Sequence, residues 1–345
     1  MKILFVGLGS IGQRHLRNIK RLYGEEAEIM AYRVRGLSRT FSDDMKIKVG
    51  VDLEKEYNIN VFSDYADALK EKPDAVFITN ITSKHVEYAL KAAEANCDIF
   101  MEKPLSDSLY NISELVDVVN ANNCVFYMGY QNRYHPCIIH TREVLRQGVL
   151  GRLLSADNEF SERLSTMHTY EDYRQTYMAR KEMGGGPVLN LQIHCFDYLQ
   201  WLLGTPVSVY SVCPKSSALE VDVECSSSSI FEFSTSEGYK LPVYTHTDFF
   251  QYPPVHKLKI VGENGRIEAD INKAIFRFFI EGELKEEQVY GDFVRNDMFI
   301  TEIKDFFTQI KDRKQPSSDI SQGVVGLKMA LAAKESSEKH IVINL

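Results

Sequence analysis

A glycine-rich turn between an apolar run and a helical pattern, close to the N-terminus, constrains the fold more than any other stretch of this sequence. Lys2–Val6 is the short, continuously apolar run that is typical of a central strand in a parallel sheet. Gly7, Gly9 and Gly12 follow directly at the GxGxxG spacing, and an amphipathic helical pattern overlaps the last of them. The order strand, glycine turn, helix predicts the first unit of an α/β fold.

The three glycines have different physical roles at this spacing. The first permits a tight turn, the second lets the backbone approach a pyrophosphate, and the third allows the helix to pack closely against the strand. The unbonded amide groups at the start of the helix attract the anion. The sequence therefore predicts a dinucleotide site at these residues: Gly7, Gly9, Ser10, Ile11 and Gly12. An ordinary glycine-rich turn is the alternative.

Length and composition limit the classes of function. A chain of 345 residues indicates two domains. The formal net charge of -8 and the absence of a basic block argue against nucleic acid as a partner. Six cysteines without CxxC or metal-ligand spacing predict reduced, buried thiols, a cytoplasmic location and no metal site. No apolar stretch approaches the ~20 residues that cross a bilayer, so no membrane partner is expected.

Strand and helix patterns divide the chain near residue 129. Residues 1–128 alternate between apolar strands and amphipathic helices, which predicts a doubly wound parallel sheet. Residues 129–345 are dominated by strand-like segments with turn signals between them, which predicts an α+β domain with a large, open, mainly antiparallel sheet. The fold class is therefore α/β plus α+β. Two amphipathic helices are predicted near the end of the chain, at 299–310 and 324–335.

The end of the second predicted strand, at Glu28–Tyr32, bears on the choice of cofactor. An NAD-preferring fold places an acid there, about 20 residues after the glycines, to bind the ribose hydroxyls. This chain has Arg33 and Arg35 instead, with Ser38 and Arg39 after them. Because arginine binds phosphate in a bidentate manner, the pattern predicts NADP, with NAD still possible. A solvated basic loop is the alternative.

Other candidates follow later strands, at the sheet edge where such folds bind ligands. Thr79 ends the strand at 75–79, and Asn80 and His85 follow it, although His85 is equally compatible with a solvent-facing helix start. Glu102, Lys103 and Pro104 end the strand at 97–101. A lysine fixed there by a proline is well placed to face a bound nicotinamide, and Glu102 would line the same site.

A second group of polar residues lies in the other half of the chain. Gly184, Gly185 and Gly186 are followed by Pro187, which suits the first turn of a helix. On that helix Asn190, His194 and Asp197 have i, i+4, i+7 spacing and share one face. The helix is otherwise apolar, so this face is a candidate site. A hydrogen-bonded core histidine is the alternative for His194.

These motifs, taken together, resemble the Gfo/Idh/MocA family of nicotinamide-dependent oxidoreductases. The resemblance rests on GxGxxG, Glu-Lys-Pro at 102–104, Arg-x-His-Pro at 133–136, and Gly-Gly-Gly followed by His194 and Asp197. It implies a Rossmann domain and a second domain whose open sheet often builds dimers or tetramers. It also implies that Lys103 and His194 act on a substrate hydroxyl or carbonyl.

One position departs from the family pattern. Members usually have Asp-x-x-x-His, whereas this chain has Asn190 four residues before His194. Asparagine can hold a hydroxyl or orient His194, but it cannot accept a proton, so proton transfer falls to Lys103 and His194. The resemblance also makes Arg133, Tyr173 and Arg174 candidate substrate contacts. A plain surface loop is the alternative for the last two.

The function expected from these features is hydride transfer between NAD(P) and a secondary alcohol or ketone of a sugar or sugar nucleotide. Asn190 leaves open a regulatory or scaffolding protein that binds the cofactor without redox chemistry. A third reading is a glycosidase that uses a tightly held nicotinamide for transient oxidation. A homodimer or homotetramer is expected.

Overall fold

A computed structural model describes residues 1–34, 39–42, 46–235 and 237–345, and it divides into two compact units. The first unit comprises Met1–Gly129 and Phe299–Val324, and the second comprises Tyr130–Met298 and Val325–Leu345. A single division at residue 129 does not account for the return of the chain to the first unit. Arg35 and Ser38, predicted near the ribose, lie outside the described residues.

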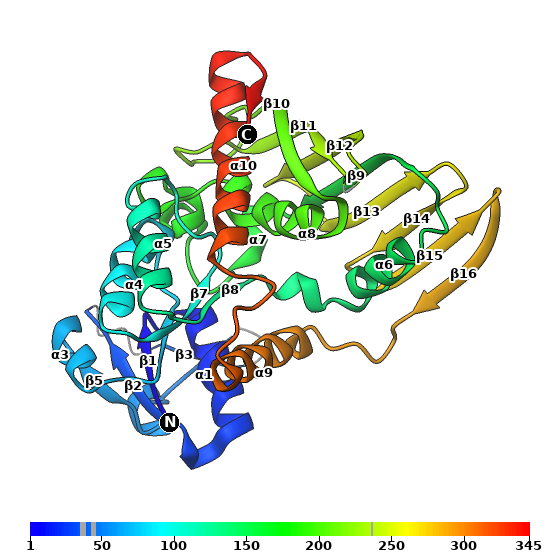
Figure 1. Ribbon diagram of the computed structural model, residues 1–345. Helices are drawn as coiled ribbons and strands as arrows, with labels where there is room; N and C mark the ends of the chain where they lie inside the picture. Colours follow the sequence, from blue (N-terminus) through cyan, green and yellow to red (C-terminus); the bar gives the residue numbers. More distant parts are fainter. Residues whose placement is uncertain (35–38, 43–45, 236) are drawn as a thin grey trace. The chain divides into compact units, whose positions relative to one another are not determined.

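The first unit is built on a six-stranded parallel sheet with the order β5-β2-β1-β6-β7-β8 (Figure 1). Its central strands are apolar and buried, as expected where helices cover both faces. The doubly wound parallel sheet predicted from the sequence is confirmed. The strands are β1 Lys2–Val6, β2 Glu28–Tyr32, β5 Asn60–Phe62, β6 Ala75–Ile78, β7 Asp98–Glu102 and β8 Phe126–Gly129.

Helices connect these strands and bury their apolar stripes. On α1, Leu16 and Ile19 pack into the same core as Ile3 and Phe5 of β1. A two-stranded ribbon, β3 Thr40–Phe41 and β4 Ile47–Lys48, lies between β2 and β5 in the chain. The helices are α1 Ser10–Tyr23, α2 Leu53–Glu56, α3 Tyr65–Lys70, α4 His85–Glu94 and α5 Ile112–Ala121.

The core of the first unit is completed by α9, Asn296–Asp312, from far along the chain. Phe306 of this helix sits among aromatic rings of three neighbouring strands. Its ring centroid lies 5.6 Å from those of Phe77 and Phe100 and 5.7 Å from that of Tyr127. The predicted amphipathic helix at 299–310 therefore supplies core residues to the N-terminal sheet.

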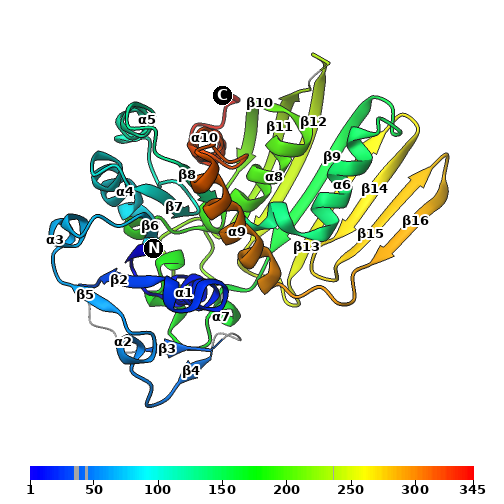
Figure 2. The same ribbon diagram turned by 60° about the horizontal axis from the view of Figure 1, so that its bottom comes forward.

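The second unit contains a nine-stranded sheet with the order β16-β15-β14-β13-β9-β12-β11-β10-β17 (Figure 2). The pairing is antiparallel except between β9 and β12, which confirms the mainly antiparallel sheet. Three of its strands, β15, β16 and β17, were not predicted. The strands are β9 Leu153–Ser161, β10 Thr205–Val212, β11 Ser226–Ser234, β12 Lys240–Asp248, β13 Val255–Gly262, β14 Gly265–Asp270, β15 Ile275–Ile280, β16 Glu283–Val289 and β17 Ile343–Asn344.

One face of this sheet is buried and the other is exposed. Burial alternates along β11, β12 and β13, which is the pattern of an antiparallel sheet with one solvated face. The helices of this unit are α6 Pro136–Arg146, α7 Leu164–Met167, α8 Ile193–Leu203 and α10 Ile320–Lys339, whose first turn belongs to the first unit. Among the helices of the described ranges, none combines the length and hydropathy needed to cross a bilayer.

We expect Phe306→Ala to destabilise the first unit by about 3–5 kcal/mol, because it leaves a cavity inside a packed aromatic cluster. Phe307→Ala is the matched control, since Phe307 is only partly buried beside the same core and should cost less. Denaturant unfolding followed by circular dichroism measures both free energies. Equal costs for the two variants would contradict the central position of Phe306.

Candidate functional site

The glycine turn after β1 has the geometry that a pyrophosphate site needs. Gly7 has a φ of 92°, and a Cβ there would lie 2.9 Å from the Cα of Asn80. A Cβ on Gly12 would lie 2.6 Å from the carbonyl oxygen of Gly7, so this close helix approach requires glycine. At Gly9 a Cβ would meet nothing within 4 Å, which leaves the backbone open to a ligand. No side chain caps the start of α1, so its first amides face this opening.

Thr79, at the end of β6, supports the turn from behind. Its Oγ1 donates a hydrogen bond of 2.5 Å to the carbonyl oxygen of Gly7, and its side chain is buried. This contact fixes the turn between two neighbouring parallel strands. Thr79 was predicted on the cofactor side, and the structure gives it a bracing role there.

Gln13 is a supporting residue that the sequence reading missed. From the first turn of α1 its Nε2 donates to the carbonyl oxygens of Leu8, at 3.0 Å, and Arg39, at 2.8 Å. Its Oε1 accepts the backbone N–H of Phe41 at 2.7 Å. Gln13 therefore joins the glycine turn to the segment beyond β2. The sequence indicated this role only weakly, by a single glutamine within the amphipathic pattern of α1.

Arg33 follows β2, the position where the adenosine ribose lies in such folds. Its Nη1 donates to Oε1 of Glu54, on α2, at 2.5 Å. Glu54 of α2 thus places a carboxylate beside Arg33, although the sequence directly after β2 has arginines and no acid at this position. A phosphate at this position would compete with Glu54 for the guanidinium.

Lys103 lies at the carboxyl end of β7, the same sheet edge as the glycine turn. The side chain of Glu102 is buried beside it and accepts the backbone N–H of Lys103 through Oε2 at 3.3 Å. Its other oxygen accepts a 2.7 Å hydrogen bond from Nε2 of His15, on α1. Glu102 therefore holds the backbone of the Lys103 turn, and its predicted contact with a cofactor stays a prediction.

His85 braces the same turn from the start of α4. It is buried, so the solvent-facing alternative is wrong. Its Nδ1 lies 2.8 Å from the carbonyl oxygen of Pro104 and its Nε2 lies 3.2 Å from that of Asn80. Burial lowers the pKa of the imidazole, so His85 is neutral near pH 7 and its one N–H serves the shorter contact, to Pro104.

The second candidate group, in the second unit, begins with the glycine loop at 184–186. The helix after it opens with a π-helical turn, Val188–Gln192, before α8. Nδ2 of Asn190 donates to the carbonyl oxygen of Gly186 at 2.8 Å and to that of Gly184 at 3.4 Å. An aspartate would present oxygens to these carbonyls, so the amide suits this position. Asn190 fixes the loop that precedes His194.

His194 is buried at the start of α8, next to aromatic rings. Its ring centroid lies 6.0 Å from that of Phe160, which itself stacks on His256 at 4.1 Å. Burial lowers the pKa of His256 to about 3, so His256 stays neutral and acts as a packing group. His194 therefore stays a predicted candidate for chemistry in this unit.

Asp197 and Arg133 form a buried ion pair. Nε of Arg133 donates to the two carboxylate oxygens at 2.9 Å and 3.1 Å, and Nη2 donates to Oδ1 at 2.5 Å. The guanidinium also lies 5.3 Å from the ring of Trp201. The geometry does not support the predicted substrate contact for Arg133. Asp197 likewise pairs with Arg133, so the expected three-residue polar face reduces to Asn190 and His194.

Arg174 and Tyr173 lie in a surface segment of the second unit. Arg174 pairs with Asp172 through Nε and Nη2 and with Glu220 through Nη1, at 2.6–3.0 Å. The hydroxyl of Tyr173 accepts the backbone N–H of Glu220 at 3.4 Å. These contacts order the loop, which favours the surface-loop alternative for both residues.

One group of histidine and glutamate side chains in the described part of the chain is close enough together to be considered for a cation. His15, Glu102 and Glu302 have side-chain donor atoms within 4.8 Å of one another, and all three are buried in the first unit. The sequence prediction of no metal site did not consider this group, because Glu302 is 200 residues from Glu102 in the chain.

Comparison with known protein families matches both halves of the chain. Residues 1–130 match the model described as an oxidoreductase family with an NAD-binding Rossmann fold, and residues 138–268 match the Gfo/Idh/MocA C-terminal domain. Among curated proteins, the chain is 24% identical to myo-inositol 2-dehydrogenase of Thermotoga maritima, over 100% of this chain and 98% of that protein.

Solved structures with the same fold include levoglucosan dehydrogenase in complex with NADH, with a TM-score of 0.85 and 17% identity over 100% of this chain and 98% of that one. The WlbA dehydrogenase from Bordetella pertussis, in complex with NADH and UDP-GlcNAcA, has a TM-score of 0.80 and 18% identity over the same shares. The family models and the strand-turn-helix geometry agree on a nicotinamide-binding first unit. This chain belongs to the Gfo/Idh/MocA family of oxidoreductases.

Proposed function

We propose that this protein transfers a hydride between a nicotinamide dinucleotide and a secondary alcohol or ketone of a sugar or sugar nucleotide. The observation that carries the proposal is the place of Lys103, at the carboxyl end of β7 and on the sheet edge of the glycine turn. The names of the relatives support the substrate class, since they include dehydrogenases of inositol and levoglucosan and a structure that holds a UDP-sugar.

The chemistry divides between the cofactor and the side chains. A bound nicotinamide would accept or return the hydride. In the oxidation direction the alcohol also loses its hydroxyl proton, which Lys103 and His194 would take and relay, and in reduction they would return it to the carbonyl oxygen. Asn190, as an amide, takes no part in this transfer and keeps the loop before His194 in place.

We expect Lys103→Ala to lower turnover ~10²-fold or more, because it removes the group that moves the substrate proton. Affinity for the reduced cofactor, measured by its fluorescence, should change little. Lys84→Ala is the control, since Lys84 is exposed and pairs with Glu87 on α4. Unchanged turnover of the Lys103 variant on an identified sugar would remove this residue from the mechanism.

The alternative functions differ in what happens to the cofactor. A regulatory protein would bind the dinucleotide and leave its absorbance unchanged with every sugar; the use of Asn190 as a loop brace, rather than the family's usual Asp, is the observation in its favour. A glycosidase with transient oxidation would release product with no net change in absorbance. A screen of sugars and sugar nucleotides with both redox forms of the cofactor separates these outcomes from steady hydride transfer.

We also propose that NADP is the preferred dinucleotide and that Arg33 and Glu54 set this preference. The guanidinium would bind the 2′-phosphate of NADP after leaving Glu54, whereas the carboxylate of Glu54 is suited to the ribose hydroxyls of NAD.

Arg33→Ala should therefore weaken NADP binding by about tenfold without weakening NAD binding, since a charge-assisted hydrogen bond contributes about 1.5–3 kcal/mol. Glu54→Gln should strengthen NADP binding because it frees the guanidinium. Dissociation constants for both dinucleotides, measured by calorimetry, check this. Tighter binding of NAD than of NADP by the unmodified protein would contradict the preference.

A homo-oligomer is proposed from the exposed face of the nine-stranded sheet. Tyr210, Ile230 and Tyr244 stand directly opposite one another on β10, β11 and β12, and their exposed fractions are 41%, 50% and 45%. Such a row of apolar side chains suits burial against a second copy. The molar mass from light scattering should exceed 39.5 kDa at least twofold, and Ile230→Glu should lower it towards one chain.

A cytoplasmic location is proposed from the cysteines. All six are free thiols, and five of them are buried. Burial raises the pKa of Cys97, Cys137 and Cys195 to about 12, so they stay protonated and unreactive, as in a reducing compartment.

A further inference from the structure

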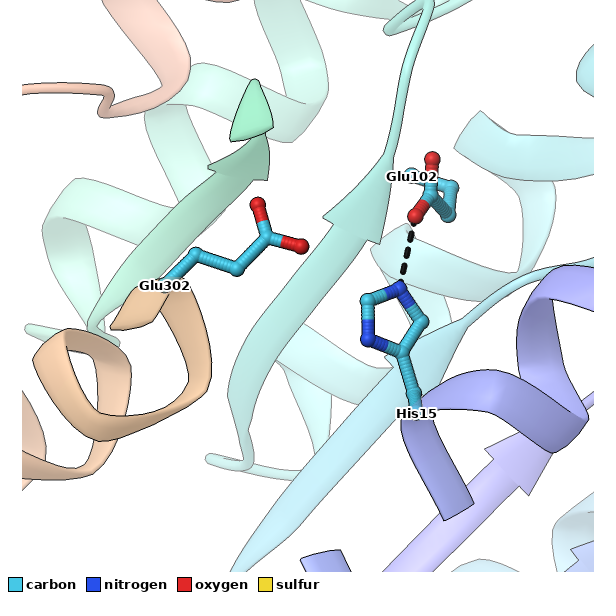
Figure 3. Close-up of side chains that lie close together, drawn as sticks. All are labelled: His15, Glu102 and Glu302. Carbon is cyan, nitrogen blue, oxygen red and sulfur yellow. Dashed lines mark hydrogen bonds and ion pairs between the residues drawn. The ribbon is translucent and has the colours of Figure 1, made fainter. Parts of the chain in front are cut away.

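A buried carboxyl group that makes no hydrogen bond within the described part of the chain lies close to Glu102, the residue before Lys103. Glu302 extends from α9 towards His15 of α1 and Glu102 of β7, as Figure 3 shows. The exposed fractions of Glu302 and His15 are 0% and that of Glu102 is 6%. The rings of Phe77, Phe100 and Phe299 lie within 6 Å of the His15 ring, so the surroundings are apolar.

The two carboxyl groups are satisfied very differently. Glu102 accepts hydrogen bonds from His15 and from the backbone of Lys103. Neither carboxyl oxygen of Glu302 has a hydrogen-bond partner among the described residues. An ionised carboxylate without a donor, in an apolar interior and within 4.8 Å of a second carboxylate, is strongly unfavourable.

We propose that Glu302 is a neutral carboxylic acid in the folded protein, and that it is a positioning residue that lets Glu102 remain over the backbone of Lys103. A charged Glu302 would repel the carboxylate of Glu102 and pull apart the contacts with His15 and Lys103. The positioning part rests on the proposed role of Lys103, whereas the protonation of Glu302 does not.

A divalent cation is the competing way to neutralise the cluster. The geometry disfavours it, because Nε2 of His15 is bonded directly to Oε1 of Glu102 at 2.7 Å. A zinc ion would have to replace this bond by ligand contacts of about 2.0–2.2 Å to each atom, and the protein would supply only three ligands in a fully buried space. A proton on Glu302 removes one of the two carboxylate charges and leaves the bond between His15 and Glu102 in place.

Several titratable or charged groups lie on the elements packed around this cluster. Burial raises the pKa of Glu302 well above its usual range, and the carboxylate of Glu102 adds to the shift. The groups are Arg14 and His15 on α1, Glu102 and Lys103 at the end of β7, His85 at the start of α4, and Asp305 one turn along α9. All of them are retained in the variants below, so the comparison isolates the titration of Glu302 together with its interactions with these groups.

The protonation gives unfolding a characteristic pH dependence. A carboxyl with a raised pKa keeps its proton in the folded chain at pH values where the unfolded chain, with a pKa of about 4.3, has lost it. Unfolding then releases a proton, and stability falls as pH rises until the folded-state pKa is passed. Relative to Glu302→Gln, the unfolding constant of the unmodified protein should rise by up to tenfold per pH unit between about pH 5 and 7.

The test combines this comparison with infrared spectroscopy. The unmodified protein should show the carbonyl band of a protonated carboxylic acid at pH 7, and Glu302→Gln should lack it. Glu114→Gln, on the exposed side of α5, is the control for both measurements and should change neither. The band is measured on the unmodified protein, so the proposal remains testable if the variant does not fold.

Turnover and metal content give two further tests. Glu302→Ala should lower turnover without weakening cofactor binding, and Glu302→Gln should restore turnover because the amide is also neutral; failure of this rescue would remove the positioning role alone. Absence of the acid band at pH 7, or one equivalent of divalent metal that Glu302→Gln loses, would overturn the proposal. Neither the band nor the metal content depends on whether the protein turns over a sugar.

Discussion

The first unit depends on the close approach of three backbone segments behind the glycine turn. A Cβ on Gly12 would meet both the carbonyl oxygen of Gly7, at 2.6 Å, and Oγ1 of Thr79, at 2.7 Å. Thr79 occupies this space to hold the same carbonyl through a hydrogen bond. The turn is therefore locked by packing and hydrogen bonding before any ligand arrives, so binding does not have to order it.

A similar principle governs the two candidate catalytic side chains, each of which follows a segment fixed from behind. Glu102 and His85 hold the backbone around Lys103, and Asn190 holds the glycine loop before His194. Lys103 and His194 lie in different units, and each unit supports its own contribution. Reactive groups gain from such support because small displacements reduce catalysis steeply.

Local patterns predicted much of this architecture. The bounds of β1 and β2 follow from apolar runs, and the glycine spacing gave the turn, because these features depend on residues adjacent in the chain. Contacts between distant residues were not accessible in this way. Arg133 and Asp197 form a pair although they are 64 residues apart in the chain. Glu302 and Glu102 lie close together in space although they are also far apart in the sequence. For the same reason Arg133 looked like a substrate contact, and β16, which is charged and exposed along its length, gave no strand signal.

The return of α9 to the first unit has a consequence for how the chain folds during synthesis. Ile303 and Phe306 are part of the core built by β1, β6 and β7, yet they follow strands β9 to β16 of the second unit in sequence. A ribosome that has produced only the first 129 residues presents a parallel sheet with its aromatic core open to water. The second unit also waits for residues made late, Val325–Leu345, so neither unit is complete until the end of the chain has been made, and the apolar face of the first unit stays open in the interval.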